Sequence, residues 1–166
     1  MRFKDFITSK DYKIYVDLDG VLCDFVRQFE SLGHGSIKEV EAESEEKFWK
    51  IIKDEGVDFW SKMPWFKGSQ KLWDYLKDNY QNIQILSALS KEKESEIGKK
   101  EWINRELGDV KAILVKNPKE KQQYANNKSI LIDDMEKNIK QWKDSGGIGI
   151  LFQSAKQVIS KLKELR

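Results

Sequence analysis

The sequence predicts an α/β protein with a Rossmann-like parallel sheet, and two features of its 166 residues support this. Short runs rich in Ile, Val and Leu, without polar alternation, are typical of strands buried on both faces of a parallel sheet. Between these runs, apolar residues recur at helical spacing, so strand and helix alternate along the chain. We expect strands at Lys13–Leu18, Ile83–Leu86, Ala112–Val115, Ile130–Ile132 and Ile148–Phe152.

Helices are expected between and after the later strands. Ser69 is expected to cap the first of them, and Gly108 to end the second, because glycine commonly follows a helix C-terminus. A third helix runs from Met135 toward Gly146, and Ser154 opens the last. The order strand, helix, strand is that of a doubly wound sheet.

Residues 24–68 break the alternation, because they contain no strand pattern. An acidic, helix-prone run is followed there by a dense group of aromatic residues. We therefore expect a small helical cap at residues 24–68, inserted after the first strand of a core formed by residues 1–23 and 69–166.

Composition excludes several kinds of protein and site. The net charge of +2 gives no sign of binding to a nucleic-acid polymer. The N-terminus is too polar for a signal peptide, and no apolar run approaches the ~20 residues of a membrane span, so we expect a cytoplasmic protein without membrane contact. One cysteine, Cys23, and one histidine, His34, are too few for a His-based zinc site or a Ser-His-Asp triad. Any chemistry must rest on carboxylates, lysines and hydroxyls.

The first chemical motif is YVDLDGVLCDF, at residues 15–25. Asp17 and Asp19 follow an apolar strand, at the end where open α/β sheets bind ligands. Residues two apart in a strand point the same way, so both carboxylates can reach one site. There they can hold Mg²⁺ through oxygen, or one can attack phosphorus while the other handles the proton. The structural alternative is a turn at Asp19-Gly20, with Asp17 capping the next helix.

A second acidic pair, Asp133 and Asp134, ends the apolar run in SILIDDMEKN. Adjacent acids at a buried strand end repel each other and lose hydration unless a cation compensates, which favours a metal site. The alternative is that Asp134 caps the helix near Met135, although a single acid would suffice for that.

Two further residue types complete the candidate site. Ser87 ends the second strand, where its hydroxyl and the following amides can hold a phosphoryl oxygen, although serine is ordinary at a strand end. A phosphate also needs a cation to balance its charge. The segment KNPKEKQQYA offers Lys116, Lys119 and Lys121.

In this order the motifs resemble those of the haloacid dehalogenase superfamily of phosphatases. The resemblance implies that Asp17 is the nucleophile and Asp19 the general acid/base of a DxDG motif. Ser87 then matches the hydroxyl motif. The pair Asp133 and Asp134 matches the acidic metal motif.

The lysine is assigned from one branch of the superfamily, the cytosolic and mitochondrial 5'(3')-deoxyribonucleotidases and their bacterial and phage relatives. KQQYA before LIDD resembles the lysine segment of that branch, which assigns Lys121 as the phosphate-binding lysine. Lys119 is the first alternative, followed by Lys99 and Lys100 in KKEWI. DGVLCDF, MPWFKGS, KKEWI and LIDDMEKNIKQW also resemble this group, from about residue 13 to residue 153.

The resemblance implies an Mg²⁺-dependent phosphomonoester hydrolase that acts through an aspartyl-phosphate. Mg²⁺ would be held by Asp17, the Asp19 backbone carbonyl and an acid of the Asp133–Asp134 pair. The implied substrate is a small phosphate monoester, namely a (deoxy)nucleoside monophosphate. A sugar phosphate or another small metabolite is the alternative substrate, and a phospho-receiver or binding domain is the non-enzyme alternative. The sequence leaves the oligomeric state open, and a homodimer is compatible with it.

Aromatic residues of the expected cap are candidates for substrate recognition. Adjacent aromatics such as Phe59 and Trp60 cannot both point inward from a regular helix. Stacking of a base on an aromatic side chain contributes roughly 1–3 kcal/mol. We expect Phe25 and Trp60 to contact a nucleobase, whereas most of the other aromatics are expected to fill the core of the cap.

Overall fold

The computed structural model describes residues 11–165 and contains one five-stranded parallel sheet. The polar N-terminal segment, residues 1–10 of the expected core, lies outside the described residues, as does Arg166. The strand order is β3-β2-β1-β4-β5. The strands are β1 (Lys13–Val16), β2 (Asn82–Ala88), β3 (Lys111–Val115), β4 (Ser129–Asp133) and β5 (Ile148–Leu151). The predicted α/β class and parallel sheet are confirmed.

Strand β1 lies at the centre of the sheet, where the strand order reverses. It pairs in parallel with β2 through Val16 and Ile85, and with β4 through Val16 and Ile132. The carboxyl ends of these three strands are therefore level with one another. In open α/β sheets, the crevice outside this point is the usual place for a ligand.

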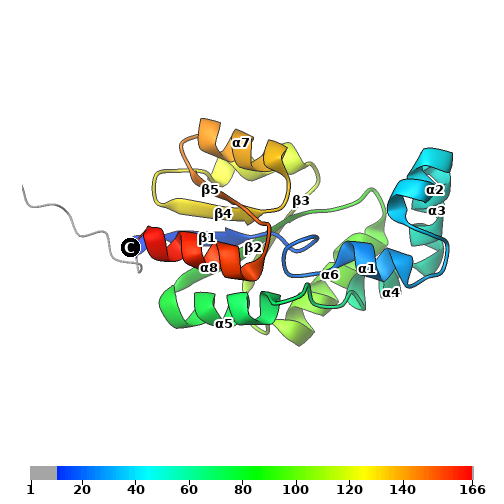
Figure 1. Ribbon diagram of the computed structural model, residues 1–166, viewed down its shortest axis with the longest axis horizontal. Coiled ribbons are helices and arrows are strands. Elements are labelled where there is room, and N and C mark those ends of the chain that lie inside the picture. Colours follow the sequence, from blue (N-terminus) through cyan, green and yellow to red (C-terminus); the bar gives the residue numbers. More distant parts are fainter. Residues whose placement is uncertain (1–10, 166) are drawn as a thin grey trace, which may run out of the picture.

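Helices cover both faces of the sheet, with α7 on one face and α5 and α8 on the other (Figure 1). Their bounds are α5 (Ser69–Asn79), α6 (Lys93–Glu106), α7 (Glu136–Asp144) and α8 (Ala155–Glu164), and a 3₁₀ helix, η2, spans Pro118–Tyr124. The Ile, Val and Leu side chains of β1 and β4 are almost completely buried between these layers, as the unalternated runs predict, whereas several of those in β2, β3 and β5 are only partly buried. Within residues 11–165, no helix has the length and apolar character needed to cross a bilayer.

A serine was expected to cap each of two helices, and the structure confirms one of these two caps. Ser154 caps α8 by accepting a hydrogen bond from the Gln157 amide, as expected. Ser69 is not the N-cap of α5, because Gly68 occupies that position with φ of +83°. The Ser69 hydroxyl is buried and donates instead to the Val21 carbonyl at 2.5 Å, which ties α5 to the loop after β1.

Four helices lie between β1 and α5, and Figure 1 shows them at one end of the sheet. They are α1 (Phe25–Glu30), α2 (Ile37–Glu43), α3 (Glu45–Glu55) and α4 (Val57–Ser61). Ser36 and Glu39 form a capping box at the start of α2, and Ser44 caps α3. Buried side chains of these helices belong to the same apolar cluster as those of the sheet, so the insertion shares a core with the rest of the chain.

The last part of the insertion is attached closely to α6. A Cβ atom on Gly98 would lie 2.5 Å from the Cβ of Trp60, so only glycine permits this approach of α4 and α6. The Trp102 indole donates to the Met63 carbonyl at 2.8 Å, and Arg105 donates to another carbonyl of the same segment at 2.6 Å. These contacts make α4 and the loop after it part of the support of the sheet.

Candidate active site

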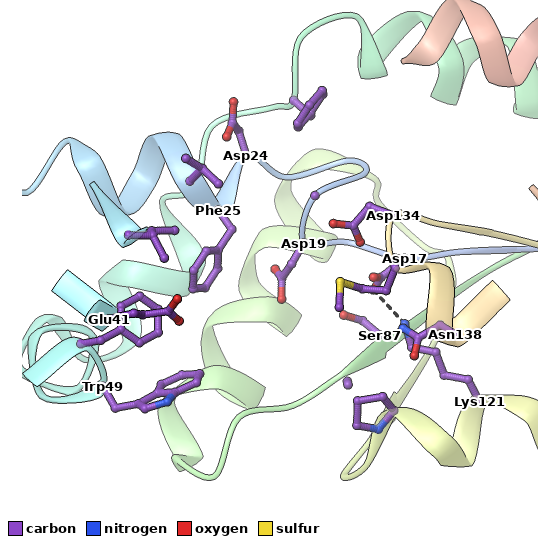
Figure 2. Close-up of a pocket in the computed structure, with 18 residues that line it drawn as sticks. Asp17, Asp19, Asp24, Phe25, Glu41, Trp49, Ser87, Lys121, Asp134 and Asn138 are labelled. Atoms are coloured by element: carbon purple, nitrogen blue, oxygen red, sulfur yellow. Dashed lines mark ion pairs between the residues drawn. The ribbon is translucent and has the colours of Figure 1, made fainter. Parts of the chain in front are cut away.

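A cleft of about 480 Å³ opens at the carboxyl end of β1, between the sheet and helices α1–α3. Figure 2 shows Asp17, Ser87, Lys121 and Asp134 gathered on one side of it, and Phe25, Glu41 and Trp49 on the other. Most of the residues predicted from the sequence therefore line one cavity. These are Asp17, Asp19, Phe25, Ser87, Lys121 and Asp134, whereas Asp133 and Trp60 do not line it.

Asp17 follows the last residue of β1 and is 6% exposed. Its Oδ1 atom accepts a hydrogen bond from the Leu18 amide at 2.8 Å and lies 3.3 Å from Lys121 Nζ. Lys121 comes from η2, is buried, and donates to Asp133 Oδ2 at 2.7 Å. Burial alone would lower the pKa of Lys121, but the carboxylates of Asp17 and Asp133 outweigh it and raise that pKa. Lys121 therefore carries a fixed positive charge beside Asp17.

Asp133 is fully buried, and both of its carboxylate oxygens are occupied by protein donors. Oδ1 accepts from the Met135 amide at 2.9 Å, Oδ2 accepts from Lys121, and the Asn138 side chain donates to both oxygens at 3.1–3.2 Å. Asp133 thus positions Lys121 and the start of α7. The N-cap of α7 is Met135, without a side-chain capping bond, so Asp134 is not the helix cap that the alternative interpretation required.

Three carboxylates could hold a metal ion at this point. Asp17, Asp133 and Asp134 each offer an oxygen, and these oxygens lie within 4.8 Å of one another. Desolvation, together with the charges of Asp17 and Asp133, raises the pKa of Asp134 to about 7. A hard divalent cation bound by oxygen would relieve this repulsion.

Gly20 allows Asp134 to approach the loop after β1. Its φ is +79°, and a Cβ atom there would lie only 2.1 Å from Asp134 Oδ2. The glycine of the DGV turn is therefore required both by the backbone conformation and by the position of the second carboxylate.

A second buried lysine, Lys99, lies on α6 with no exposed surface. Its ammonium group donates to Asp19 Oδ2 at 2.8 Å, to Ser87 Oγ at 3.1 Å and to the Ala88 carbonyl at 2.5 Å. It also lies 5.3 Å from the centre of the Trp60 ring. Lys99 therefore joins two of the predicted residues, Asp19 and Ser87.

Asp19 has one oxygen bound by Lys99 and one without a partner. Asp19 Oδ1 is buried, and no donor within residues 11–165 reaches it. Desolvation raises the pKa of Asp19, while Lys99 opposes that rise. A carboxyl group with a raised pKa is suited to proton transfer.

The four candidate lysines are separated clearly by the structure. Lys121 and Lys99 are both buried at the site, where Lys121 pairs with Asp17 and Lys99 pairs with Asp19. Lys119 and Lys100 are exposed, and Lys100 pairs with Glu96 one helical turn earlier.

The two aromatic residues expected to contact substrate occupy different positions. Phe25 is partly buried and lines the cleft. Trp60 is 3% exposed and packs behind it, with ring centroids 5.9 Å apart. Trp49 and Glu41, which were not selected from the sequence, line the cleft opposite the carboxylates (Figure 2).

Comparison with known proteins identifies the fold. No protein-family model and no curated protein sequence matches the chain. Among solved structures, a superfamily hydrolase of the haloacid dehalogenase type from Ehrlichia chaffeensis aligns with a TM-score of 0.59 and 14% identity, over 96% of this chain and 98% of that one. A haloacid dehalogenase-like family hydrolase from Xanthomonas campestris aligns with a TM-score of 0.60 and 10% identity, over 93% and 91%.

A hydrolase from Streptococcus pneumoniae TIGR4 is also similar, with a TM-score of 0.57 and 18% identity over 92% of this chain and 99% of that chain. The similarity covers nearly the full length in each case, and so includes the helices between β1 and α5 as well as the sheet. The chain therefore has the fold of haloacid dehalogenase superfamily hydrolases, as the sequence motifs implied.

Proposed function

We propose that the protein is a magnesium-dependent phosphohydrolase that uses Asp17 as a covalent nucleophile on small phosphate monoesters. The observation that carries this proposal is the position of Asp17 at the carboxyl end of the central strand, 3.3 Å from Lys121 and in the same cleft as Ser87, whose hydroxyl accepts a hydrogen bond from Lys99. Cationic groups and a hydroxyl around one carboxylate can neutralise a phosphoryl group while that carboxylate attacks phosphorus.

The residues present fit a magnesium ion. Asp17 and Asp134 are the two carboxylates of the cluster that line the cleft, whereas Asp133 is fully engaged by Lys121, Asn138 and the Met135 amide. We therefore assign Asp17 and Asp134 as direct ligands. The resemblance to the superfamily implies that the Asp19 backbone carbonyl is a third ligand. When bound, Mg²⁺ would offset the negative charge of the phosphoryl oxygens and of the two carboxylates.

The first half of the reaction transfers the phosphoryl group to the protein. A carboxylate oxygen of Asp17 bonds to phosphorus, and the bond from phosphorus to the substrate oxygen breaks. Asp19 gives its proton to the departing oxygen, which leaves as an alcohol. Ser87 and Lys121 stabilise the charge on the remaining phosphoryl oxygens, while Lys99 holds the Ser87 hydroxyl in place at 3.1 Å.

The second half restores Asp17. Water attacks the phosphorus of the aspartyl-phosphate, and Asp19, now ionised, takes its proton. The bond from phosphorus to Asp17 breaks, which releases inorganic phosphate and the free carboxylate. Lys99 donates to Asp19 Oδ2 at 2.8 Å and so orients the carboxyl group that carries the proton in both halves.

At a finer level, we propose a nucleotidase of the 5'(3')-deoxyribonucleotidase type that acts in the cytoplasm. The sequence resemblance supports this choice, as does an aromatic wall opposite the carboxylates in a cleft of a size usual for small-molecule sites. A phosphatase for sugar phosphates or another metabolite is the second candidate. A phospho-receiver domain needs no second carboxyl group for proton transfer beside the nucleophile, so Asp19, whose pKa is raised by burial, favours turnover.

The test is multiple turnover of p-nitrophenyl phosphate with Mg²⁺ and with EDTA. We expect turnover only with Mg²⁺, and a loss of at least ~10³-fold in Asp17→Asn, because that change removes the nucleophile while keeping its size. Asp144→Asn, at an exposed pair with Lys140, is the matched control and should retain activity. Near wild-type turnover by Asp17→Asn, or turnover unaffected by EDTA, would disprove the proposal.

A further inference from the structure

One acidic side chain on the far wall of the cleft has no role in the fold. Helix α2 carries Glu39, Glu41 and Glu43. Glu39 completes the capping box with Ser36, and Glu43 forms an ion pair with Lys47 at 2.8 Å. Glu41 lines the cleft, and within residues 11–165 no hydrogen-bond donor or cation is paired with its carboxylate. Its carboxylate is therefore available to a ligand.

The surroundings of Glu41 are flat and apolar. Trp49 is 41% exposed although its ring packs edge-on against Phe48 at 5.0 Å, so one part of the indole remains open at the cleft. Phe25 and Ile37 line the same wall, and Figure 2 shows Phe25, Glu41 and Trp49 close together. A planar apolar group is the natural partner of such a surface, with its polar edge directed at the carboxylate.

The charge of the cleft restricts what that group can be. Lys121, at the catalytic end, is the one basic residue among those of residues 11–165 that line the cleft. Away from that end, the cleft is lined by two further carboxylates, those of Asp24 and Glu41. A second anionic group on the substrate would find no cation there and would be repelled, whereas an N–H donor would be accepted.

We propose that Glu41 is a specificity-determining residue that accepts a hydrogen bond from the exocyclic amino group of a nucleobase. This inference rests on the proposed function and names its substrate class as nucleoside monophosphates with amino-bearing bases. Uracil is disfavoured, because its ring N–H lies between two carbonyl oxygens that an acceptor-only carboxylate repels. Guanine, in contrast, presents an N–H and an amino group side by side, which suits both oxygens of one carboxylate.

The test compares substrates that differ at the amino group. The pairs are 2'-deoxycytidine against 2'-deoxyuridine 5'-monophosphate, and 2'-deoxyguanosine against 2'-deoxyinosine 5'-monophosphate. A hydrogen bond to a charged group can change the binding affinity by about one to two powers of ten. Glu41 is exposed to solvent, which reduces that effect. We therefore expect about a 10-fold preference in kcat/KM for the nucleotide that carries the amino group, in at least one of the two pairs.

Two variants test whether the Glu41 side chain causes the preference for the nucleotide that carries the amino group. Glu41→Gln and Glu41→Ala should each bring the preference to within about 2-fold of unity, since both remove the acceptor-only carboxylate. Glu46→Gln removes the same charge from an exposed position of α3 that does not line the cleft, and it should keep the wild-type preference. Because the readout is a ratio between paired substrates, a general loss of activity does not imitate it.

Three outcomes would overturn the inference: no preference in either pair, a preference that persists in Glu41→Gln, or equal changes in Glu41→Gln and Glu46→Gln. Hydrolysis of p-nitrophenyl phosphate without hydrolysis of any of the four nucleotides would also overturn it, while leaving the phosphohydrolase proposal intact. Failure of the wild-type protein on p-nitrophenyl phosphate would instead disprove the proposed function itself.

Discussion

Replacement of Gly20 by alanine should weaken the metal site through Asp134, although Gly20 has no side chain to bind anything. The added Cβ would lie 2.1 Å from Asp134 Oδ2 and 2.6 Å from Asp134 Cγ, so the carboxylate must move away from the cluster. Loss of correct ligand placement typically costs 10- to 100-fold in metal affinity, and we expect a change of about that size in the Mg²⁺ concentration for half-maximal activity.

The matched control for this prediction is Gly108→Ala. Gly108 has φ of +77°, close to the +79° of Gly20, but a Cβ there meets no atom within 4 Å. Both variants place alanine in the left-handed region, at a cost of about 1–2 kcal/mol in unfolding free energy, or roughly 2–8 °C in melting temperature. Only Gly20→Ala should change the response to Mg²⁺. Equal Mg²⁺ dependence in the two variants would refute the assignment of Asp134 as a ligand that Gly20 makes room for.

Three further predictions follow from the site. Asp19→Asn should lose roughly 10²- to 10⁴-fold on alkyl phosphates but much less on aryl phosphates, whose leaving groups need little protonation; equal losses would argue against an acid/base role. Mg²⁺ should raise the melting temperature, and the double variant Asp133→Asn, Asp134→Asn should not show this rise; an undiminished rise would place the metal elsewhere. The pKa of Asp134 in the folded protein is raised to about 7, so in the metal-free protein its stabilising contribution is present at low pH and is lost as the pH rises from about 4 to 7. Mg²⁺ should therefore raise the melting temperature more at pH 8 than at pH 5. Calorimetry that finds equal rises at the two pH values would contradict this.

The acidic residues of the site could be predicted from the strands that precede them. Asp17 and Asp133 follow short apolar runs, and the parallel order of those runs places their carboxyl ends side by side. Lys99 was only an alternative, because a lysine within a helix is usually exposed. The neighbouring Gly98 carried a signal, since a glycine inside a helix often marks close packing against another element.

Local rules were less reliable where tertiary contacts compete with them. Ser69 is a good N-cap by residue type, but its hydroxyl bonds to the Val21 carbonyl and Gly68 takes the cap position. The adjacent aromatics Phe59 and Trp60 were expected to face different ways, yet both are buried because α6 covers α4 on one side. Burial of Trp60 depends on that helix pair, which the order of residues alone does not reveal.

The close contact of α4 with α6 divides the insertion into two parts with different freedom to evolve. Helix α6 carries Lys99, whose ammonium group touches Asp19, Ser87 and the Trp60 ring. Any substitution that separates α4 from α6 is therefore expected to disturb Asp19 and Ser87 as well. Helices α2 and α3 have no such connection to Lys99, and they carry Glu41 and Trp49. Exchange of residues 37–55 between related proteins is thus expected to change the wall of the cleft opposite the carboxylates while Lys99 stays in place, whereas exchange of residues 57–66 is expected to disturb the packing around Lys99.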